Sequence, residues 1–161
     1  MKILFVIDIL DTNNNGTSIS AQRFARELKR RGHEVRILCA DPQEKDENGV
    51  ALPVEVTGKY IVPEFIIPLF DPLVKKHGFA YGDFLPRSKP VIHEAVEWAD
   101  VVHTFFPFPF DMVASKYAAK IGKPNTGVGF LPEPLQVGDF LLKSCHHSKC
   151  GETSVGVVLF P

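Results

Sequence analysis

The stretch Lys2-Ile3-Leu4-Phe5-Val6-Ile7-Asp8-Ile9-Leu10 decides the fold, because it is an almost unbroken apolar run at the start of the chain. Such a run is typical of a strand covered on both faces, as in a parallel sheet. The residues that follow, 11–17, are all polar apart from Gly16, which can take a positive φ or let another group approach the backbone closely. We therefore expect a buried first strand that ends in a polar loop.

A helix is predicted directly after this loop. Thr17 or Ser18 is suited to cap it, and Gly32 is suited to end it. A second buried strand is expected at residues 35–40, which makes the unit a βαβ unit. One helical face is apolar and carries Ala21, Phe24, Ala25 and Leu28.

The alternation of strands and helices continues along the chain. We predict an open α/β fold of the three-layer, Rossmann-like, doubly wound type with a mostly parallel sheet. Residues 1–130 are expected to form this domain, and 131–161 an atypical tail of a different character. The further elements expected are strands at 50–57, 101–106 and 125–130, helices at 91–99 and after an Asp111 cap, and a short helix at 72–77 within an aromatic-rich excursion.

Composition excludes several classes of protein. The formal net charge of the 161-residue chain is -1, which gives no general attraction for nucleic acid. Three cysteines, at no disulfide-like spacing, fit a reducing cytoplasm better than a secreted scaffold. No apolar run approaches the roughly 20 residues of a membrane span. We expect a cytoplasmic protein, with peripheral contact with the inner face of a membrane as a further option.

Five stretches follow one another in a recognisable order and spacing. They are Gly16-Thr17-Ser18 after the first strand, 28–35 (LKRRGHEV), 99–103 (ADVVH), Phe106-Pro107-Phe108-Pro109 and 121–124 (IGKP). Together they resemble the N-terminal domain of the family 4 (group 1) glycosyltransferases, which have the two-domain GT-B architecture. The resemblance implies a retaining enzyme that transfers a sugar from a nucleotide-sugar to a lipid or glycan acceptor.

Two groups of site residues follow from this resemblance. Asn15, Gly16 and Thr17 would bind the donor diphosphate through backbone N–H groups and the helix N-terminus, although Gly16 is also compatible with an ordinary turn. The acceptor side would hold His103, Phe106, Pro107 and Phe108, although a strand histidine and apolar neighbours also suit simple packing. No metal or other cofactor is required, since the nucleotide-sugar is a substrate.

The sequence departs from the family pattern after the fifth expected strand. Phe130 is followed by Leu131, where the family usually has a histidine, so no catalytic residue is assigned. The donor-binding C-terminal half is also missing from the sequence. We therefore expect a truncated domain, inactive without a second domain as its partner. Dimerisation through the face that this domain would cover is a further option. The alternative is a non-catalytic α/β binding or interaction module.

Three other features allow two interpretations each. Asp41 follows the second strand, where dinucleotide folds hold a ribose, but the G-x-G-x-x-G loop is absent and a structural role is favoured. Residues 145–150 (CHHSKC) have ligand types suited to zinc at a spacing that fits no closed site, so a disordered or partner-facing tail is favoured. A basic face could touch anionic lipid, although a solvated helix face is favoured. It comprises Arg23, Arg26, Lys29, Arg30, Arg31 and Arg36.

Overall fold

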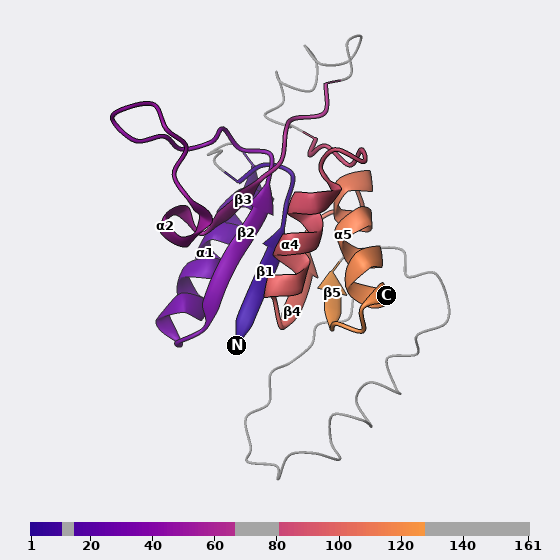
Figure 1. The fold of residues 1–161 in the computed structure, drawn as a ribbon. Coiled ribbons are helices and arrows are strands. Elements are labelled where there is room, and N and C mark those ends of the chain that lie inside the picture. Colours follow the sequence, from indigo (N-terminus) through magenta and orange to yellow (C-terminus); the bar gives the residue numbers. More distant parts are fainter. Residues whose placement is uncertain (11–14, 67–80, 128–161) are drawn as a thin grey trace. The chain divides into compact units, whose positions relative to one another are not determined.

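The residues that the structure describes, 1–10, 15–66 and 81–127, form a five-stranded sheet with the order β3-β2-β1-β4-β5 (Figure 1). The structure is a computed structural model. Each pair of neighbouring strands is parallel. The elements are β1 (Lys2–Val6), α1 (Gly16–Arg30), β2 (Glu34–Cys39), α2 (Val54–Thr57), β3 (Lys59–Ile61), α4 (Lys89–Trp98), β4 (Val101–Thr104), α5 (Pro109–Lys120) and β5 (Asn125–Gly127).

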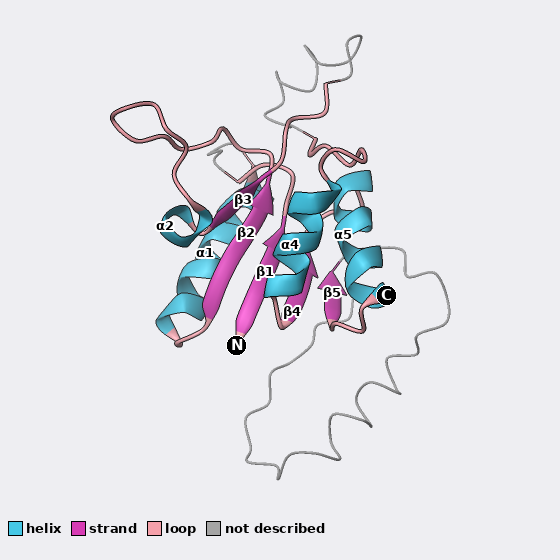
Figure 2. Ribbon diagram, viewed as in Figure 1, coloured by secondary structure: helices cyan, strands magenta, loops and turns pink. Residues whose placement is uncertain are grey.

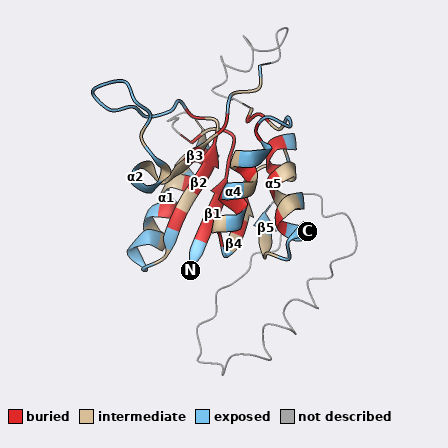
Figure 3. Ribbon diagram, viewed as in Figure 1, coloured by how far each residue is buried: buried red, intermediate tan, exposed pale blue. Residues whose placement is uncertain are grey.

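Helices cover both faces of the sheet, which confirms the predicted three-layer fold (Figure 2). Alternate residues of β1 point to opposite faces, so Leu4 and Val6 belong to a core beneath α4 and α5. Phe5 and Ile7 belong to a second core beneath α1. Burial is therefore concentrated in the central strands and on the inner faces of the helices (Figure 3).

Helix α1 differs from its predicted start and from its predicted apolar face. Asn15 is the N-cap instead of Thr17 or Ser18, since its Oδ1 accepts a hydrogen bond from Thr17 N at 3.0 Å. Phe24 is 57% exposed, although Ala25 is buried. One residue is about 100° of rotation around a helix, so Phe24 lies beside the contact face and not on it.

The strand predicted at 50–57 is wrong. Residues Val54–Thr57 form the short helix α2, and the third strand follows it as β3. Pro53 precedes the helix as its N-cap, and Gly58 ends it with φ 70°. The left-handed backbone at Gly58 turns the chain sharply, which separates a helical turn from the strand that follows.

Asp111 is not the cap of α5, in contrast to the prediction. The helix begins at Pro109, whose fixed φ suits the first helical position, and Phe108 is the N-cap. Asp111 therefore lies within the first turn, where it is buried.

Some predictions concern segments outside the described residues. They are the helix at 72–77, the end of the strand at 128–130, the domain boundary near 130 and the tail at 131–161. Within the described part of the chain, no helix is both long and apolar enough to cross a membrane.

Candidate functional site

The carboxyl ends of β1 and β4 form the topological switch point of the sheet. Strands β2 and β3 lie on one side of β1, and β4 and β5 lie on the other. In open α/β sheets, ligands bind in the crevice outside the carboxyl ends of the strands at such a point. The start of α1 and one buried aspartate follow the carboxyl end of β1. A second buried aspartate and a group of aromatic rings follow β4 or lie against residues that do.

The predicted donor-phosphate residues Asn15, Gly16 and Thr17 form the start of α1. A Cβ built on Gly16 would meet no atom of a described residue within 4 Å, so these residues leave the backbone open to approach on that side. The Nδ2 group of Asn15 is buried and has no hydrogen-bond partner among the described residues. The first N–H groups of any helix lack partners within the helix, and they carry partial positive charge.

Two side chains of α1 fix its start against the end of β1. The buried Ser18 donates from Oγ to the carbonyl of Ile9 at 2.8 Å. Gln22 donates from Nε2 to the carbonyl of Leu10, also at 2.8 Å. These bonds satisfy carbonyl groups that lie beyond the last residue of β1, and they hold the helix terminus in a defined place.

Three aromatic rings, which we name the aromatic wall, are those of Phe106 and Phe108 after β4 and of Tyr81 in the segment before α4. The rings of Phe106 and Phe108 stack with centroids 5.2 Å apart, and Tyr81 meets Phe108 edge-on at 5.3 Å. All three side chains are half-buried, and Pro107 between the two phenylalanines is exposed. The structure thus brings the predicted acceptor-side residues Phe106 and Phe108 together, and it adds Tyr81, which the sequence did not indicate.

His103 is separate from this wall. It lies within β4, its Nδ1 is 2.9 Å from Thr126 Oγ1, and its ring packs against Phe5 and Phe105. Since Phe5 belongs to the core beneath α1, His103 lies on that face of the sheet. Burial lowers the pKa of His103, so the imidazole is neutral at pH 7.

Two buried aspartates were missed by sequence reasoning. Asp8 follows β1 and accepts a hydrogen bond from Gly82 N at 2.7 Å, and Asp111 lies in the first turn of α5. Both are almost fully buried, at 2% and 1% exposure. Burial and the neighbouring Asp8 charge raise the pKa of Asp111 to about 9. In the sequence, the only sign of these two residues is that each places a single carboxylate in an otherwise apolar segment.

The sequence profile of Glycosyltransferase Family 4 matches residues 14–127, which include α1, the aromatic wall and Asp111. The chain belongs to this family. The family assignment agrees with the resemblance noted from the sequence, and it makes the chain a family 4 glycosyltransferase-like domain.

Other comparisons add little to this assignment. No curated protein matches the sequence of the family 4 domain. Among solved structures, it is similar to the C-terminal domain of a hydrogenase from Pyrococcus furiosus, with 21% sequence identity and a TM-score of 0.45. That likeness covers 78% of this chain and 89% of the hydrogenase domain.

Asp41 of the family 4 domain has a structural role, as the favoured interpretation predicted. Its carboxylate is fully buried and accepts a hydrogen bond from Leu10 N at 2.8 Å. Cys39 Sγ donates to Asp41 at 3.5 Å, and Lys59 Nζ lies 3.8 Å away. These contacts occupy the carboxylate, so it is not available to a ribose.

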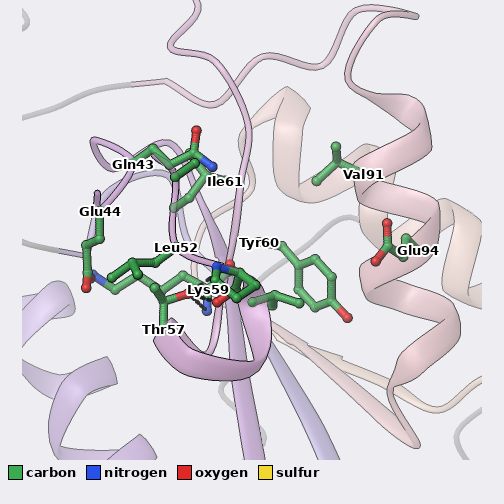
Figure 4. A pocket seen from close by; sticks show the side chains of 12 residues that line it. Gln43, Glu44, Leu52, Thr57, Lys59, Tyr60, Ile61, Val91 and Glu94 are labelled. Atoms are coloured by element: carbon green, nitrogen blue, oxygen red, sulfur yellow. Dashed lines mark hydrogen bonds and ion pairs between the residues drawn. The ribbon is translucent and has the colours of Figure 1, made fainter. Parts of the chain in front are cut away.

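A pocket of about 270 Å³ lies beside β3, which is an edge strand of the sheet (Figure 4). Lys59 and Glu44 line it and form an ion pair with a separation of 3.0 Å. Tyr60 of β3 and Glu94 of α4 line its other side. The lining combines one paired cation, two carboxylates and several apolar side chains, and it presents no set of convergent polar groups.

The basic face predicted on α1 is smaller than expected. Arg36 lies on the opposite side of the sheet, where its guanidinium donates to Tyr60 Oη at 2.8 Å and stacks over Trp98. Arg30 and Arg31 both donate to Glu27 at 2.8 Å, and these bonds lower the pKa of Glu27 to about 2. The remaining exposed basic residues are Arg23, Arg26 and Lys29.

Metal ligation finds no support in the described segments. No group of three or more His, Cys, Asp or Glu side chains there could hold a metal ion. The Cys145–Cys150 cluster lies outside the described residues.

Proposed function

We propose that the chain is the acceptor-side domain of a retaining glycosyltransferase that moves a sugar from a nucleotide-sugar to a lipid or glycan acceptor. The observation that carries this proposal is the placement of Gly16. It begins a 15-residue helix at the switch-point edge of a family 4 domain, with its backbone open to approach.

The donor diphosphate would bind at Asn15, Gly16 and Thr17. A helix N-terminus attracts anions because its unpaired N–H groups and the helix dipole both favour negative charge. At this terminus the N–H of Thr17 already donates to Asn15 Oδ1, so the Asn15 side chain would have to turn aside to release it to a phosphate. Negative charge grows on the diphosphate as the glycosidic bond breaks, and fixed dipoles at that position would stabilise the transition state. No metal ion is needed for this contribution.

The acceptor would bind along the aromatic wall. Half-exposed rings of Phe106 and Phe108 offer apolar faces, and Pro107 extends them toward solvent. His103 is a second acceptor-side candidate, since its neutral ring is oriented by Thr126 and its Nε2 makes no hydrogen bond to a described residue. A second domain would supply the remaining donor contacts, and the family 4 domain by itself would have little or no transferase activity.

Replacing Gly16 by valine is the direct test of the donor site. A nucleotide-sugar that binds the native state must raise the melting temperature, by about 5–10 °C at 100 times its Kd for a chain of this size. We expect one member of a panel of nucleotides and nucleotide-sugars to do so for the wild-type chain. Gly16→Val should abolish the shift, because the added side chain would occupy the space that the phosphate needs, while the melting temperature without ligand should change little.

Lys29→Val is the matched control for this experiment. It places the same side chain at an exposed position near the other end of α1. Its ligand-induced shift should equal that of the wild type. A shift that persists in Gly16→Val would contradict the donor site, and the absence of any shift for the whole panel would favour the alternative of a non-catalytic interaction module.

We also propose that α1 touches an anionic membrane surface, which would suit a lipid-linked acceptor. Arg23 and Arg26 are exposed and form no ion pair with a described residue, and Phe24 between them is 57% exposed. Basic side chains near an anionic surface contribute about 1 kcal/mol each, and an aromatic ring adds apolar burial at the interface.

Vesicle binding tests this contact. The double variant Arg23→Ala/Arg26→Ala should bind vesicles of anionic phospholipid about 30-fold more weakly at low salt, because two charges contribute about 2 kcal/mol. Phe24→Ala should weaken binding further, with less dependence on salt. Arg30→Ala is the control, since Glu27 already holds that guanidinium, and equal binding by all variants would exclude the contact.

A further inference from the structure

The carboxyl groups of Asp8 and Asp111 have unusual surroundings. Asp8 follows the central strand β1 and Asp111 lies in the first turn of α5, and both are nearly fully buried. Gly82 N donates to Asp8 Oδ1. Asp8 Oδ2 and both oxygens of Asp111 have no hydrogen-bond donor elsewhere among the described residues.

Two ionised carboxylates in this arrangement would be strongly unfavourable. Each would lose its hydration, and the two like charges would repel each other at short range. A proton on one carboxyl removes one charge and provides a donor for an oxygen of the other. Burial and the adjacent Asp8 charge are the causes that raise the pKa of Asp111, and burial raises that of Asp8 as well.

No neighbouring cation can replace this proton within the described part of the chain. Among the described residues, Asp8 is the only charged side chain that shifts the pKa of Asp111. Asp83 follows Gly82, but its carboxylate accepts hydrogen bonds from Arg87 Nε at 2.7 Å and from Ser88 Oγ at 2.5 Å. The Arg87 guanidinium is therefore engaged by Asp83.

Asp8 and Asp111 link the two segments that contain the rings of the aromatic wall. Asp8 holds Gly82, whose neighbour Tyr81 meets Phe108 just before α5. Gly82 itself lies against the ring of Phe110, which precedes Asp111. We propose that Asp8 and Asp111 share one buried proton and form a pH-sensitive clamp that holds the Tyr81–Asp83 segment against the start of α5.

The direction of the pH effect follows from the pKa of Asp111. Its value is about 9 in the folded chain and 3.8 for the ordinary group, so the folded state holds a proton that the unfolded state releases above pH 4. The stabilisation from this proton is complete below pH 4 and is progressively lost as the pH rises to about 9. Above that value the clamp carries two charges. The clamp does not depend on glycosyl transfer.

The Gly82 amide signal in a two-dimensional NMR spectrum is the test, because its N–H donates directly to Asp8. In the wild-type chain, the signal should shift between pH 6 and 10 with a midpoint near 9. Asp111→Asn should remove this step, since a neutral amide takes the place of the protonated carboxyl, and it should raise the melting temperature increasingly as the pH rises from 5 to 9. Asp46→Asn, at an exposed turn, is the control and should retain the step.

Two outcomes would overturn the clamp. One is a wild-type Gly82 signal that does not change between pH 6 and 10, and the other is a step that survives in Asp111→Asn. Asp8→Asn provides a second variant if Asp111→Asn does not fold. Its remaining Asp111 should titrate at a lower pH than in the wild type, because the neighbouring negative charge is gone, and an unchanged midpoint would contradict the shared proton.

Discussion

Replacement of Phe110 by alanine is expected to lower the free energy of unfolding by about 3–5 kcal/mol, as for other fully buried aromatic side chains. Phe110 is 1% exposed and belongs to the core between the sheet and the pair α4 and α5. Its ring also fills the space next to Gly82, so the loss removes contacts on two sides. Urea unfolding, followed by the fluorescence of the single tryptophan Trp98, would measure the change.

Gly82→Ala completes a double-mutant cycle with this variant. A Cβ at Gly82 would lie 2.6–2.9 Å from three ring atoms of Phe110, so the single replacement overpacks the core and should cost about 1–3 kcal/mol. In the double variant the new methyl group enters the space left by the ring. The combined loss should therefore be smaller than the sum of the two single losses, and additive losses would show that the two residues are not in contact.

Asp41→Ala is expected to lower the free energy of unfolding by about 2–4 kcal/mol. The replacement leaves Leu10 N without its acceptor in the interior, and it removes a buried negative charge 3.8 Å from Lys59. Asp41→Asn should cost less, since an amide oxygen can still accept from Leu10 N. The same urea titration would measure both variants.

Glu44→Ala is the matched control for Asp41→Ala. Glu44 also pairs with Lys59, at 3.0 Å, but its side chain is 48% exposed. An exposed ion pair contributes little, so this variant should stay within about 0.5 kcal/mol of the wild type. Equal losses for Asp41→Ala and Glu44→Ala would mean that the ion pair, and not the buried hydrogen bond, dominates.

The sequence predicted those elements whose burial can be inferred from the local pattern of apolar residues. The apolar run from Ile3 to Ile7 marked the central strand, and the spacing of Ala21 and Ala25 marked the inner face of α1. The fold class followed from the order of these elements. The helix after the loop was also predicted, but its cap was placed two or three residues too late, at Thr17 or Ser18 instead of Asn15.

The errors arose where two local interpretations compete. Residues 50–57 alternate in hydrophobicity like a strand, yet Val56 is 69% exposed because α2 packs little of its surface. Phe24 fits an apolar helical stripe by spacing alone, but the sheet contacts only the neighbouring face of α1. Periodicity gives the faces of an element and does not show how much of each face a neighbour covers.

The pattern of apolar residues along the chain could not predict that the two buried aspartates lie close together. Asp8 and Asp111 are far apart in sequence, and only the pairing of β4 beside β1 places the start of α5 near the end of β1. The raised pKa of Asp111 is a property of that contact and of burial, so it has no local sequence pattern. For the same reason, Tyr81 could not be assigned to the aromatic wall before the fold was known.

The strand order has a consequence for synthesis of the chain on the ribosome. One edge of β1 can pair as soon as β2 has been made, but its other edge pairs with β4, and Lys2 N donates to the Asp100 carboxylate, 98 residues later. At a synthesis rate of about 5–20 residues per second, roughly 5–20 s pass before that partner exists. During this time one edge of β1, the most apolar strand of the sheet, has unpaired backbone N–H and C=O groups. Such an edge can pair with another chain, so it is the part of the nascent chain that most needs protection.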